Sequence, residues 1–367
     1  MPPRPNERFT PPPLRTRTTI NDVAKTAGVS KATVSRFVNG GARQLSAETA
    51  ARVETVIREL GYKPSPMAQS LKHGRTRLIG LAVADITNPF SVAVLRGAEQ
   101  ACQAHGYLIV LFNLGNEAER ERGVLHALET AQLDGLILNR VHTSIQLYEE
   151  AQASGKPLVL VDRQQPGMDA DFISIDNHAA MHLALDHLHA QGWRQMLMVS
   201  EPLQGVSSRA ERKLAFHQWM AAHSTGTDAC QGTYVEVPSS DQQASTQAHL
   251  QHWLQQCQSQ GQPAAIISGN AVATLYAMGV VQRLQWQLGI DVGFIGIDET
   301  EWAPLIGPGL STIAQPTDQL GQQAVQCLIE RMEGATHPPR HVQLQGTLVT
   351  RASSLRTPTS APCIAKN

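Results

Sequence analysis

The side chains best suited to chemistry lie in residues 30–39, SKATVSRFVN. Read as a helix, this segment turns three apolar side chains to one face: Val34, Phe37 and Val38. The opposite face presents Lys31, Ala32, Ser35 and Arg36. In a major groove, Lys31 and Ala32 would lie nearest the base edges, and Arg36 could donate two hydrogen bonds to one guanine. Thr33 and Ser35 could reach phosphates. The pattern predicts a DNA-reading helix, and the alternative is a helical hairpin with a solvated basic face.

The neighbouring residues supply the elements that would position this helix. We predict a first helix over residues 20–27, with Asn21 near its cap, and left-handed backbone at Gly28 that ends it. Ser30 then caps the DNA-reading helix. A third helix over residues 47–60 would close a small hydrophobic core. This order of elements is a helix-turn-helix.

The charge of the chain is unevenly distributed. Residues 1–80 hold 14 Lys and Arg against 5 Asp and Glu, whereas the remainder holds 16 against 26. The excess of positive charge therefore coincides with the helix-turn-helix, and DNA affinity should fall steeply with salt. Residues 1–17 are rich in proline and basic, and we expect a disordered arm there.

From residue 77 onward, short apolar runs alternate with helical stretches. The runs are LIGLAVA, YLIVLFN, DGLILN, PLVLVD, FISID, QMLMVS, TYVEV, AAIISG and VGFIGID. This alternation is typical of doubly wound α/β sheets, in which ligands bind beyond the carboxyl ends of the strands. The polar residues that end the runs are Asp85, Asn113, Asn139, Asp162, Ser200, Asn270 and Asp298. We expect them to face a common cleft, although some could merely cap the next helix.

Two sets of segments resemble a known family. DVAKTAGVSKATVSRFVN, followed by ETAARV, LGYKPS and AQSLK, is similar to the DNA-binding headpiece and hinge of the lactose/galactose repressor family, LacI/GalR. LIGLAVADITNPF, the strand end VDR and LSTIAQPTDQLGQQA are similar to that family's effector-binding core. The resemblance implies a small all-α helix-turn-helix headpiece and a periplasmic-binding-protein-like core of two doubly wound α/β subdomains.

The resemblance also assigns the parts of the chain. It implies a headpiece at 18–63, a hinge at 64–77 and a core at 78–355, followed by a frayed tail at 356–367. One subdomain would take about 78–174 with 314–341, and the other about 175–313 with 342–355. Residues 66–72 would become helical only on operator DNA.

Within the headpiece and hinge, the resemblance gives Lys31, Ala32 and Arg36 the base-reading positions. Leu71 falls where the family inserts a leucine wedge into the minor groove, and its alternative is a linker leucine packed on the core. The family usually has arginine where this chain has Gln69, so one contact could be missing. The full expected DNA-binding set is Thr19, Ser30, Lys31, Ala32, Thr33, Ser35, Arg36, Asn39 and Leu71.

In the core, the resemblance and the strand-end positions together assign polar and aromatic side chains to a small effector. They are Phe90, Ser91, Asn139, Asp162, Arg163, Ser208, Arg212, Asn270, Asp298, Trp302 and Gln315. Arg212 matches the family's effector clamp, whereas Arg209 and Lys213 are expected to face solvent or a neighbouring acid such as Glu211. Asp298 could instead be a helix cap and Trp302 a core residue.

The arginines of the expected cleft favour an acidic ligand. Arg163 and Arg212 would supply two guanidinium groups, and a carboxylate-bearing effector fits such a pair better than a neutral sugar. Segments such as ADITNPFSVAVLRGAE and EPLQGVSSRAER look like the branch of the family that senses gluconate-type acids, most closely 2-ketogluconate. A neutral hexose or a purine is the alternative.

One headpiece reads too few base pairs to select a single operator, so we expect a twofold homodimer on a palindromic site. Its interface would use helices at 90–103 and 275–284. Effector binding would separate the hinges and release DNA, although the same parts could serve a corepressor. Residues 343–367 lack the leucine heptads of tetramerising relatives.

Other features of the sequence exclude competing classes. Five scattered cysteines without a CxxC pair favour reduced thiols in a cytoplasm, with no disulfide framework, metal site or cofactor. No signal peptide or membrane segment is recognisable, which counts against a secreted sugar carrier. Phosphate-loop, dinucleotide-binding and hydrolase motifs are missing, so we do not expect an enzyme.

Overall fold

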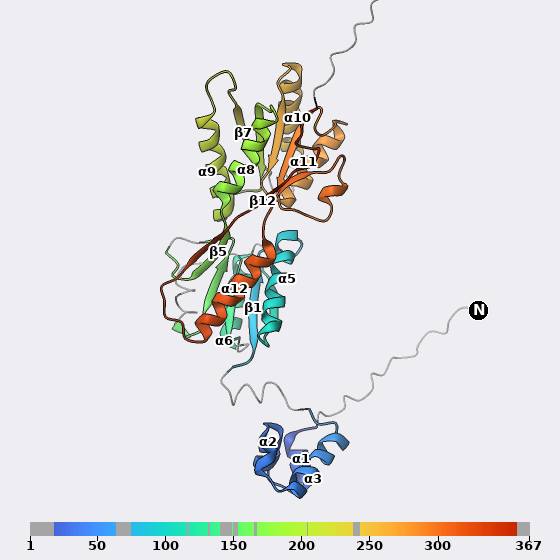
Figure 1. The fold of residues 1–367 in the computed structure, drawn as a ribbon, viewed down its shortest axis with the longest axis vertical. Coiled ribbons are helices and arrows are strands. Elements are labelled where there is room, and N and C mark those ends of the chain that lie inside the picture. Colours follow the sequence, from blue (N-terminus) through green and yellow to red (C-terminus); the bar gives the residue numbers. More distant parts are fainter. Residues whose placement is uncertain are drawn as a thin grey trace, which may run out of the picture. The chain divides into compact units, whose positions relative to one another are not determined.

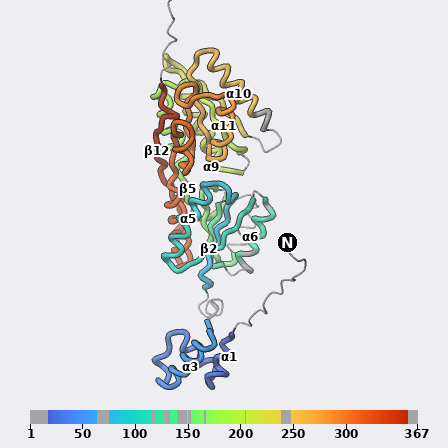
Figure 2. Tube along the Cα trace, turned by 90° about the vertical axis from the view of Figure 1, so that its right-hand side faces the viewer, coloured from blue at the N-terminus to red at the C-terminus, as the bar shows by residue number. Residues whose placement is uncertain are grey.

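The computed structural model describes residues 18–63, 75–115, 117–130, 133–139, 149, 153–164, 167–203, 205–237 and 243–357. The chain divides into two compact units, residues 1–76 and 77–367, which we call the headpiece and the core unit. Figure 1 and Figure 2 show both units. The expected arm at 1–17 and the hinge residues Gln69 and Leu71 lie outside the described residues.

The described residues of the headpiece form three short helices. They are α1 (Ile20–Ala27), α2 (Lys31–Val38) and α3 (Ala47–Glu59), with a 3-10 turn at η1 (Gly41–Gln44). Its core consists of Val23, Ala24, Ala27, Val34, Val53 and Val56. Gly28 adopts φ 64° and ends α1, which allows Ser30 to cap α2 two residues later. These features confirm the predicted helix-turn-helix.

The cap of α1 is Thr19, and Asn21, which was predicted to lie near the cap, follows it by two residues. The Thr19 side chain accepts a hydrogen bond from the backbone N–H of Asp22. The Asp22 carboxylate in turn accepts from the backbone N–H of Thr19 at 2.8 Å. This reciprocal pair is a capping box, which satisfies two helix-end donors and so fixes the start of the helix at Ile20, directly after its N-cap.

The core unit contains two six-stranded sheets. The first sheet has the order β11-β5-β4-β3-β1-β2, and all of its strands are parallel. Its strands are β1 (Leu78–Val83), β2 (Leu108–Asn113), β3 (Gly135–Leu138), β4 (Leu158–Val161), β5 (Asp171–Ile175) and β11 (His341–Leu344). Its helices are α5 (Pro89–Ala104), α6 (Ala118–Thr130) and α12 (Thr317–Met332). Helices α5 and α12 pack on one face of this sheet and α6 on the other, so the strands are buried on both sides.

The second sheet repeats this arrangement, with the order β12-β10-β9-β8-β6-β7. Its strands are β6 (Gln195–Ser200), β7 (Gln231–Glu236), β8 (Ala264–Ser268), β9 (Gly293–Ile297), β10 (Ser311–Ala314) and β12 (Thr347–Val349). Only β12 runs antiparallel to its neighbour. The helices are α8 (Asn177–Ala190), α9 (Ser207–Ala222), α10 (Gln243–Ser259) and α11 (Ala271–Arg283), with a 3-10 turn at η3 (Ala303–Leu305).

The chain crosses between the sheets three times. It crosses after β5, after β10, and between β11 and β12. At the first and third crossings, the backbone N–H of Asp176 donates to the carbonyl of Leu344 at 2.9 Å. Strand β11 pairs with β5, so residues 342–344 belong to the first sheet, whereas the sequence placed 342–355 in the second subdomain.

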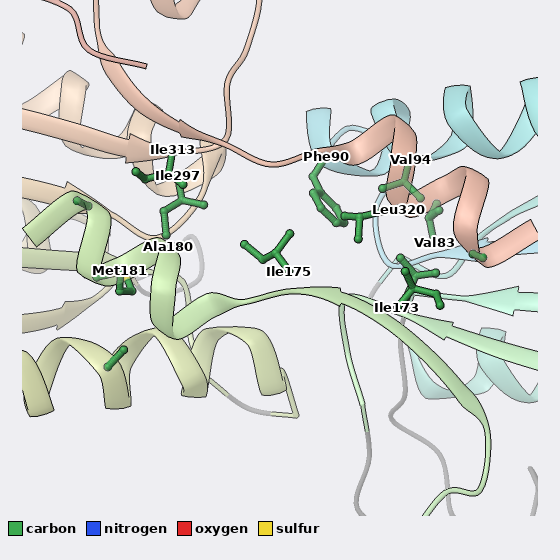
Figure 3. Close-up of a cluster of buried hydrophobic side chains, with 14 of the residues drawn as sticks. Val83, Phe90, Val94, Ile173, Ile175, Ala180, Met181, Ile297, Ile313 and Leu320 are labelled. Carbon is green, nitrogen blue, oxygen red and sulfur yellow. The ribbon is translucent and has the colours of Figure 1, made fainter. Parts of the chain in front are cut away.

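A hydrophobic cluster continues through the crossing region (Figure 3). Val83, Phe90 and Val94 gather on one side of it, and Ile297 and Ile313 on the other. Figure 3 shows Ile175 between these two groups, and it is 1% exposed. The two sheets therefore share one apolar core at the point where the chain passes from one to the other.

Membrane-spanning helices, metal sites and paired cysteines can be examined only in the part of the chain that the structure describes. Within it, no helix is long and apolar enough to cross a membrane. The same residues hold no group of three or more His, Cys, Asp or Glu side chains that could bind a metal ion. Four of the five cysteines are buried and free: Cys102, Cys230, Cys257 and Cys327.

Candidate functional site

Helix α2 presents the expected DNA-reading side chains to solvent. Lys31, Ala32 and Arg36 are exposed, whereas Thr33 and Ser35 are half-buried. The valine behind them, Val34, is fully buried in the headpiece core and fixes which face of the helix points outward.

Three other residues of the expected DNA-binding set have local structural partners. Thr19 caps α1, and the Ser30 hydroxyl accepts the backbone N–H of Thr33 at 3.1 Å. The Asn39 amide donates to the carbonyl of Ser35 at 2.6 Å and closes the end of α2. All three are exposed, so contact with a phosphate would add to these roles. Leu71 lies outside the described residues.

A cavity in the core unit is lined from both sheets. Ten of the eleven residues expected to bind effector line it: Phe90, Ser91, Asn139, Asp162, Arg163, Ser208, Arg212, Asn270, Asp298 and Gln315. They come from the carboxyl ends of strands, from the first turn of α5 and from the first two turns of α9. The strand-end rule therefore brings together residues that are more than 200 positions apart in the chain.

Three expected cleft residues are placed elsewhere. Asn113 ends β2, an edge strand, and its side chain accepts the backbone N–H of Ile86. The Ser200 side chain is buried and donates to the carbonyl of Glu201. Trp302 is not among the lining residues and packs against the core of the second sheet, as the core-residue alternative proposed.

Asp162 and Asp298 occupy equivalent places in the two sheets. Asp162 follows β4 and Asp298 follows β9, and each has a positive φ, 65° and 85° respectively. Each backbone N–H donates to the next strand, at 2.9 Å to Ile173 and 3.1 Å to Ile313. Left-handed backbone at a residue other than glycine is strained, and such strain is concentrated at ligand sites. The two aspartates thus face the cavity from opposite halves.

Asp298 is held in a polar network. Its carboxylate accepts the backbone N–H of Ala271 at 3.0 Å and the side-chain amide of Gln315 at 2.5 Å. Burial raises the pKa of Asp298, and the charge of Arg212 with these hydrogen bonds offsets part of that rise. Both donors approach the carboxylate from the second sheet and its crossover, so its orientation is fixed before any ligand arrives.

Arg212 is buried and oriented by two partners. It is 4% exposed, its Nε donates to Asn177 at 2.8 Å, and its Nη1 donates to the carbonyl of Gly269 at 2.7 Å. The Asn177 amide donates in turn to Glu211 at 2.7 Å. Glu211, expected to partner Arg209 or Lys213, therefore supports Arg212 instead. Lys213 lies over the ring of Tyr234, with Nζ 4.1 Å from the ring centroid.

Arg209 and Glu201 line the cavity although the sequence analysis assigned them no role there. Arg209 donates to Glu201 at 2.5 Å and to the carbonyl of Pro202 at 2.8 Å. Arg209 therefore contacts a neighbouring acid, one of the two expected alternatives, but that acid is Glu201 rather than Glu211. Arg209 lines the cavity because it lies three residues before Arg212 and so shares its face of α9. That spacing was the signal that could have identified Arg209.

A third guanidinium comes from the first sheet. Arg163 is 8% exposed, and its Nε lies 3.6 Å from the carboxylate of Asp162. The hydroxyl of Ser208 also donates to Asp162, at 3.4 Å. The cavity therefore combines three arginines with the carboxylates of Asp162, Glu201 and Asp298. Such a set can bind both hydroxyl groups and an acid.

Two families of proteins match this chain. Residues 19–65 match the bacterial regulatory proteins of the lacI family, and residues 185–354 match the periplasmic binding protein-like domain. The first region contains the helix-turn-helix, and the second contains all six strands of the second sheet with its half of the cavity.

Relatives cover nearly the whole chain. The HTH-type transcriptional regulator PtxS of Pseudomonas plecoglossicida is 44% identical over 343 residues, 93% of this chain and 96% of its own. The HTH-type transcriptional regulator KdgR of Bacillus subtilis is 36% identical over 336 residues, 92% and 97%.

A solved structure has the same architecture. The lac repressor dimer bound to operator and the anti-inducer ONPF matches with a TM-score of 0.77 and 26% identity, over 93% of this chain and all of that chain. These relatives are regulators and not enzymes. The chain belongs to the lacI family of bacterial transcriptional regulators.

Proposed function

We propose that this protein is an operator-specific repressor whose affinity for DNA is set by a sugar-acid effector bound in the core unit. The observation that carries the effector part is the convergence of Arg163, Arg209 and Arg212 with Asp162 and Asp298 around one cavity. A carboxylate finds charged donors there, and the hydroxyl groups of the same ligand find fixed carboxylate acceptors.

The headpiece supports the DNA part of the proposal. Lys31, Ala32 and Arg36 project from one exposed face of α2, and they would contact base edges in a major groove. Thr33 and Ser35 would hold phosphates. In the hinge, Leu71 would enter the minor groove at the operator centre. The lac repressor, a dimer bound to operator in its solved structure, is the precedent for this arrangement.

A homodimer would let two headpieces read the two halves of a palindrome. Helices α5 and α11 were expected to form the interface, and each leaves large apolar side chains exposed. Val92 on α5 is 49% exposed, and Leu275 on α11 is 54% exposed. Exposed apolar side chains on two helices of one unit favour contact with a second copy.

Within the cavity, we assign different parts of the ligand to different side chains. Asp298, Gln315 and Asn139 would bind hydroxyl groups, because their polar atoms are oriented by backbone or by one another. Phe90 would cover the apolar face of the ligand. A gluconate or 2-ketogluconate type of acid has both the carboxylate and the row of hydroxyls that this set requires.

The effector would act by changing how the two halves of the core unit meet. Since the cavity is lined from both sheets, a ligand that contacts both favours one relative position of the halves. A preference of about 1.4 kcal/mol for the state with separated hinges would weaken operator binding tenfold. The opposite preference would make the ligand a corepressor.

The proposal is tested with the full-length protein in two steps. An operator is first selected from random duplex DNA, and its binding is then measured with 2-ketogluconate, gluconate, glucose, ribose and hypoxanthine. We expect a palindromic operator that is released by one of the two acids and by none of the neutral compounds. Tighter binding with an acid would identify a corepressor. Equal operator affinity with every compound would overturn the proposed effector.

A further inference from the structure

Glu201 places a carboxylate in the lining of the cavity, where two hydrogen-bond donors meet it. One oxygen of this side chain, Oε2, accepts from Arg209 Nη2 at 2.5 Å and from Asn270 Nδ2 at 2.5 Å. All three residues line the cavity. Two donors on one oxygen, one of them a guanidinium, is the arrangement that binds a carboxylate group of a ligand.

The two donors are held in place independently of Glu201. Arg209 also donates through Nη1 to the carbonyl of Pro202 at 2.8 Å. Asn270 is the N-cap of α11, and its Oδ1 accepts the backbone N–H of Ala273 at 2.9 Å. Because its oxygen is used in the cap, only the Nδ2 group of Asn270 is left for the cavity. The pair would therefore keep its geometry if Glu201 moved away.

Glu201 is attached less firmly than its partners. It follows the last residue of β6 and lies in the connection before α9, outside any helix or strand. Its side chain is 24% exposed, against 16% for Arg209. Arg212, one turn further along α9, is 4% exposed. A side chain that already has exposed surface can turn toward solvent, whereas the buried Arg212 cannot.

We propose that Glu201 is an internal competitor for the effector's acid group. In the ligand-free protein, the Glu201 carboxylate accepts the hydrogen bonds of Arg209 and Asn270. The effector binds by placing its own carboxylate on these two donors, and it thereby displaces the carboxylate of Glu201. This inference rests on the proposed function and adds an acid subsite, Arg209 with Asn270, to the cavity that Arg212 and Asp298 form more deeply.

The competitor accounts for selectivity between ligands. If the Glu201 carboxylate moves away, Arg209 loses its negatively charged partner. A neutral polyol has no negative charge to put in its place, so it does not displace Glu201 from this subsite. An acid replaces that charge with its own. Discrimination thus comes from a cost imposed on the wrong ligand as well as from contacts to the right one.

The test is calorimetric titration of the full-length protein with gluconate, 2-ketogluconate and the neutral polyol glucitol. Glu201→Gln keeps the shape of the side chain and removes its charge. We expect it to bind the acid about tenfold more tightly than wild type, a factor worth about 1.4 kcal/mol, with the affinity for glucitol changed less than about threefold. Glu201→Ala should give the same direction of change.

Further variants separate competition from a general effect of charge. Glu236→Gln removes a carboxylate from β7, at the position paired with Ser200 of β6 and outside the cavity lining, and should leave acid binding unchanged. Arg209→Gln should weaken acid binding roughly ten- to hundredfold, the usual loss for a hydrogen bond to a charged group. In Arg209→Gln, adding Glu201→Gln should no longer tighten binding, because competitor and ligand need the same donor.

The outcomes distinguish the two proposals. If wild type binds an acid and both Glu201 variants bind it equally well or more weakly, the competitor is overturned and the sugar-acid repressor stands. If neither wild type nor the Glu201 variants bind an acid, both proposals fail. An acid that binds only the Glu201 variants supports the competitor in its strongest form.

Discussion

Arg36 is the side chain on which base discrimination depends in our proposal, and the backbone around it leaves it room. A Cβ atom at Gly41 would lie 2.7 Å from Arg36 Cγ, so glycine at that position accommodates the arginine stem. We predict that Arg36→Ala weakens binding to the selected operator by about 1–3 kcal/mol and changes binding to a scrambled duplex much less. Fluorescence anisotropy with both duplexes measures this. Arg58→Ala, on the exposed side of α3, is the control, and an equal loss on both duplexes for Arg36→Ala would contradict its role.

Asp298 should matter for effector binding and not for DNA binding. Its carboxylate accepts from both Ala271 and Gln315, and the single amide oxygen of Asn cannot accept both with the same geometry. We predict that Asp298→Asn lowers effector affinity roughly ten- to hundredfold, while operator affinity without effector stays as in wild type. Titration calorimetry and anisotropy check the two parts. Asp228→Asn, whose side chain is 72% exposed, should change neither, and unaltered effector binding in Asp298→Asn would refute the assignment.

The sequence identified cavity residues correctly where a polar residue ends a strand. Asp162, Asn270 and Asp298 were predicted to face the cavity because parallel strands end at one edge, and they do line it. Arg209 could have been identified from its three-residue spacing to Arg212 on α9, whereas Glu201 was missed because it lies in the connection between β6 and α9. No periodic pattern describes such a connection, so the pairing could not be read from spacing.

Among the elements, α5 and α12 approach each other most closely at two glycines. A Cβ on Gly97 would lie 2.1 Å from the carbonyl oxygen of Asp318, and one on Gly321 would lie 2.2 Å from that of Val94. Arg96 and Asp318 form a two-bond ion pair beside this crossing, at 2.8 and 2.9 Å. The packing of these helices therefore requires residues without side chains.

We predict that Gly97→Ala destabilises the protein by roughly 3 kcal/mol or more, because backbone rather than a flexible side chain would have to shift. The matched control is Gly123→Ala on α6, where a Cβ meets nothing within 4 Å. That change should stabilise by about 0.5–1 kcal/mol, the ordinary gain of alanine over glycine in a helix. Chemical denaturation measures both, and two variants of equal stability would show that the helices do not pack this tightly.

Asp171 joins the start of β5 to the end of α12. Its carboxylate accepts from Arg331 at 2.8 and 3.0 Å and from the backbone N–H of Arg340 at 2.8 Å, and the side chain has no exposed surface. Burial by itself would raise the pKa of Asp171, but the hydrogen bonds and charges of Arg331 and Arg340 outweigh it and leave the pKa lowered.

A lowered pKa gives stability that is present above the pKa of the unfolded chain, about 3.9, and is lost as the pH falls through the folded value. Asp171→Asn should therefore cost about 1.5–3 kcal/mol at pH 7, the usual contribution of hydrogen bonds to a charged group, because the half-buried guanidinium of Arg331 loses its acid while Arg340 keeps Glu330. The difference from wild type should shrink below about pH 4. Denaturation measured from pH 7 to pH 3 tests this, and a difference independent of pH would exclude the charge as its cause.

The sequence predicted nine of the twelve strands that the described residues form. It missed Ser311–Ala314, His341–Leu344 and Thr347–Val349, which are three or four residues long. Shortness alone is not the reason, because β3 and β4 also have four residues and were predicted. Two of the missed strands, β11 and β12, lie at sheet edges and are partly exposed, so they lack the continuous apolar run that marked the buried strands. Tertiary pairing, not local pattern, makes these segments extended.

For the whole molecule, the division at residues 76 and 77 predicts separable activities. All lining residues of the cavity lie in the core unit, and α1, α2 and α3 lie in the headpiece. A fragment that begins at Arg77 should bind the effector with the affinity of the full chain and should not bind the operator. Calorimetry and a gel-shift on that fragment provide the measurement. An effector affinity that depends on the headpiece would show that ligand binding needs residues before 77.

The three crossings between the sheets also constrain how the protein is made. Strand β11 and helix α12 complete the first sheet, yet both are encoded within the last 60 residues of the chain. During translation, the first sheet therefore stays incomplete, with the edge of β5 unpaired, until α12 and β11 leave the ribosome. A premature stop codon before β11 would damage the half that was synthesised first as well as the half that was synthesised last.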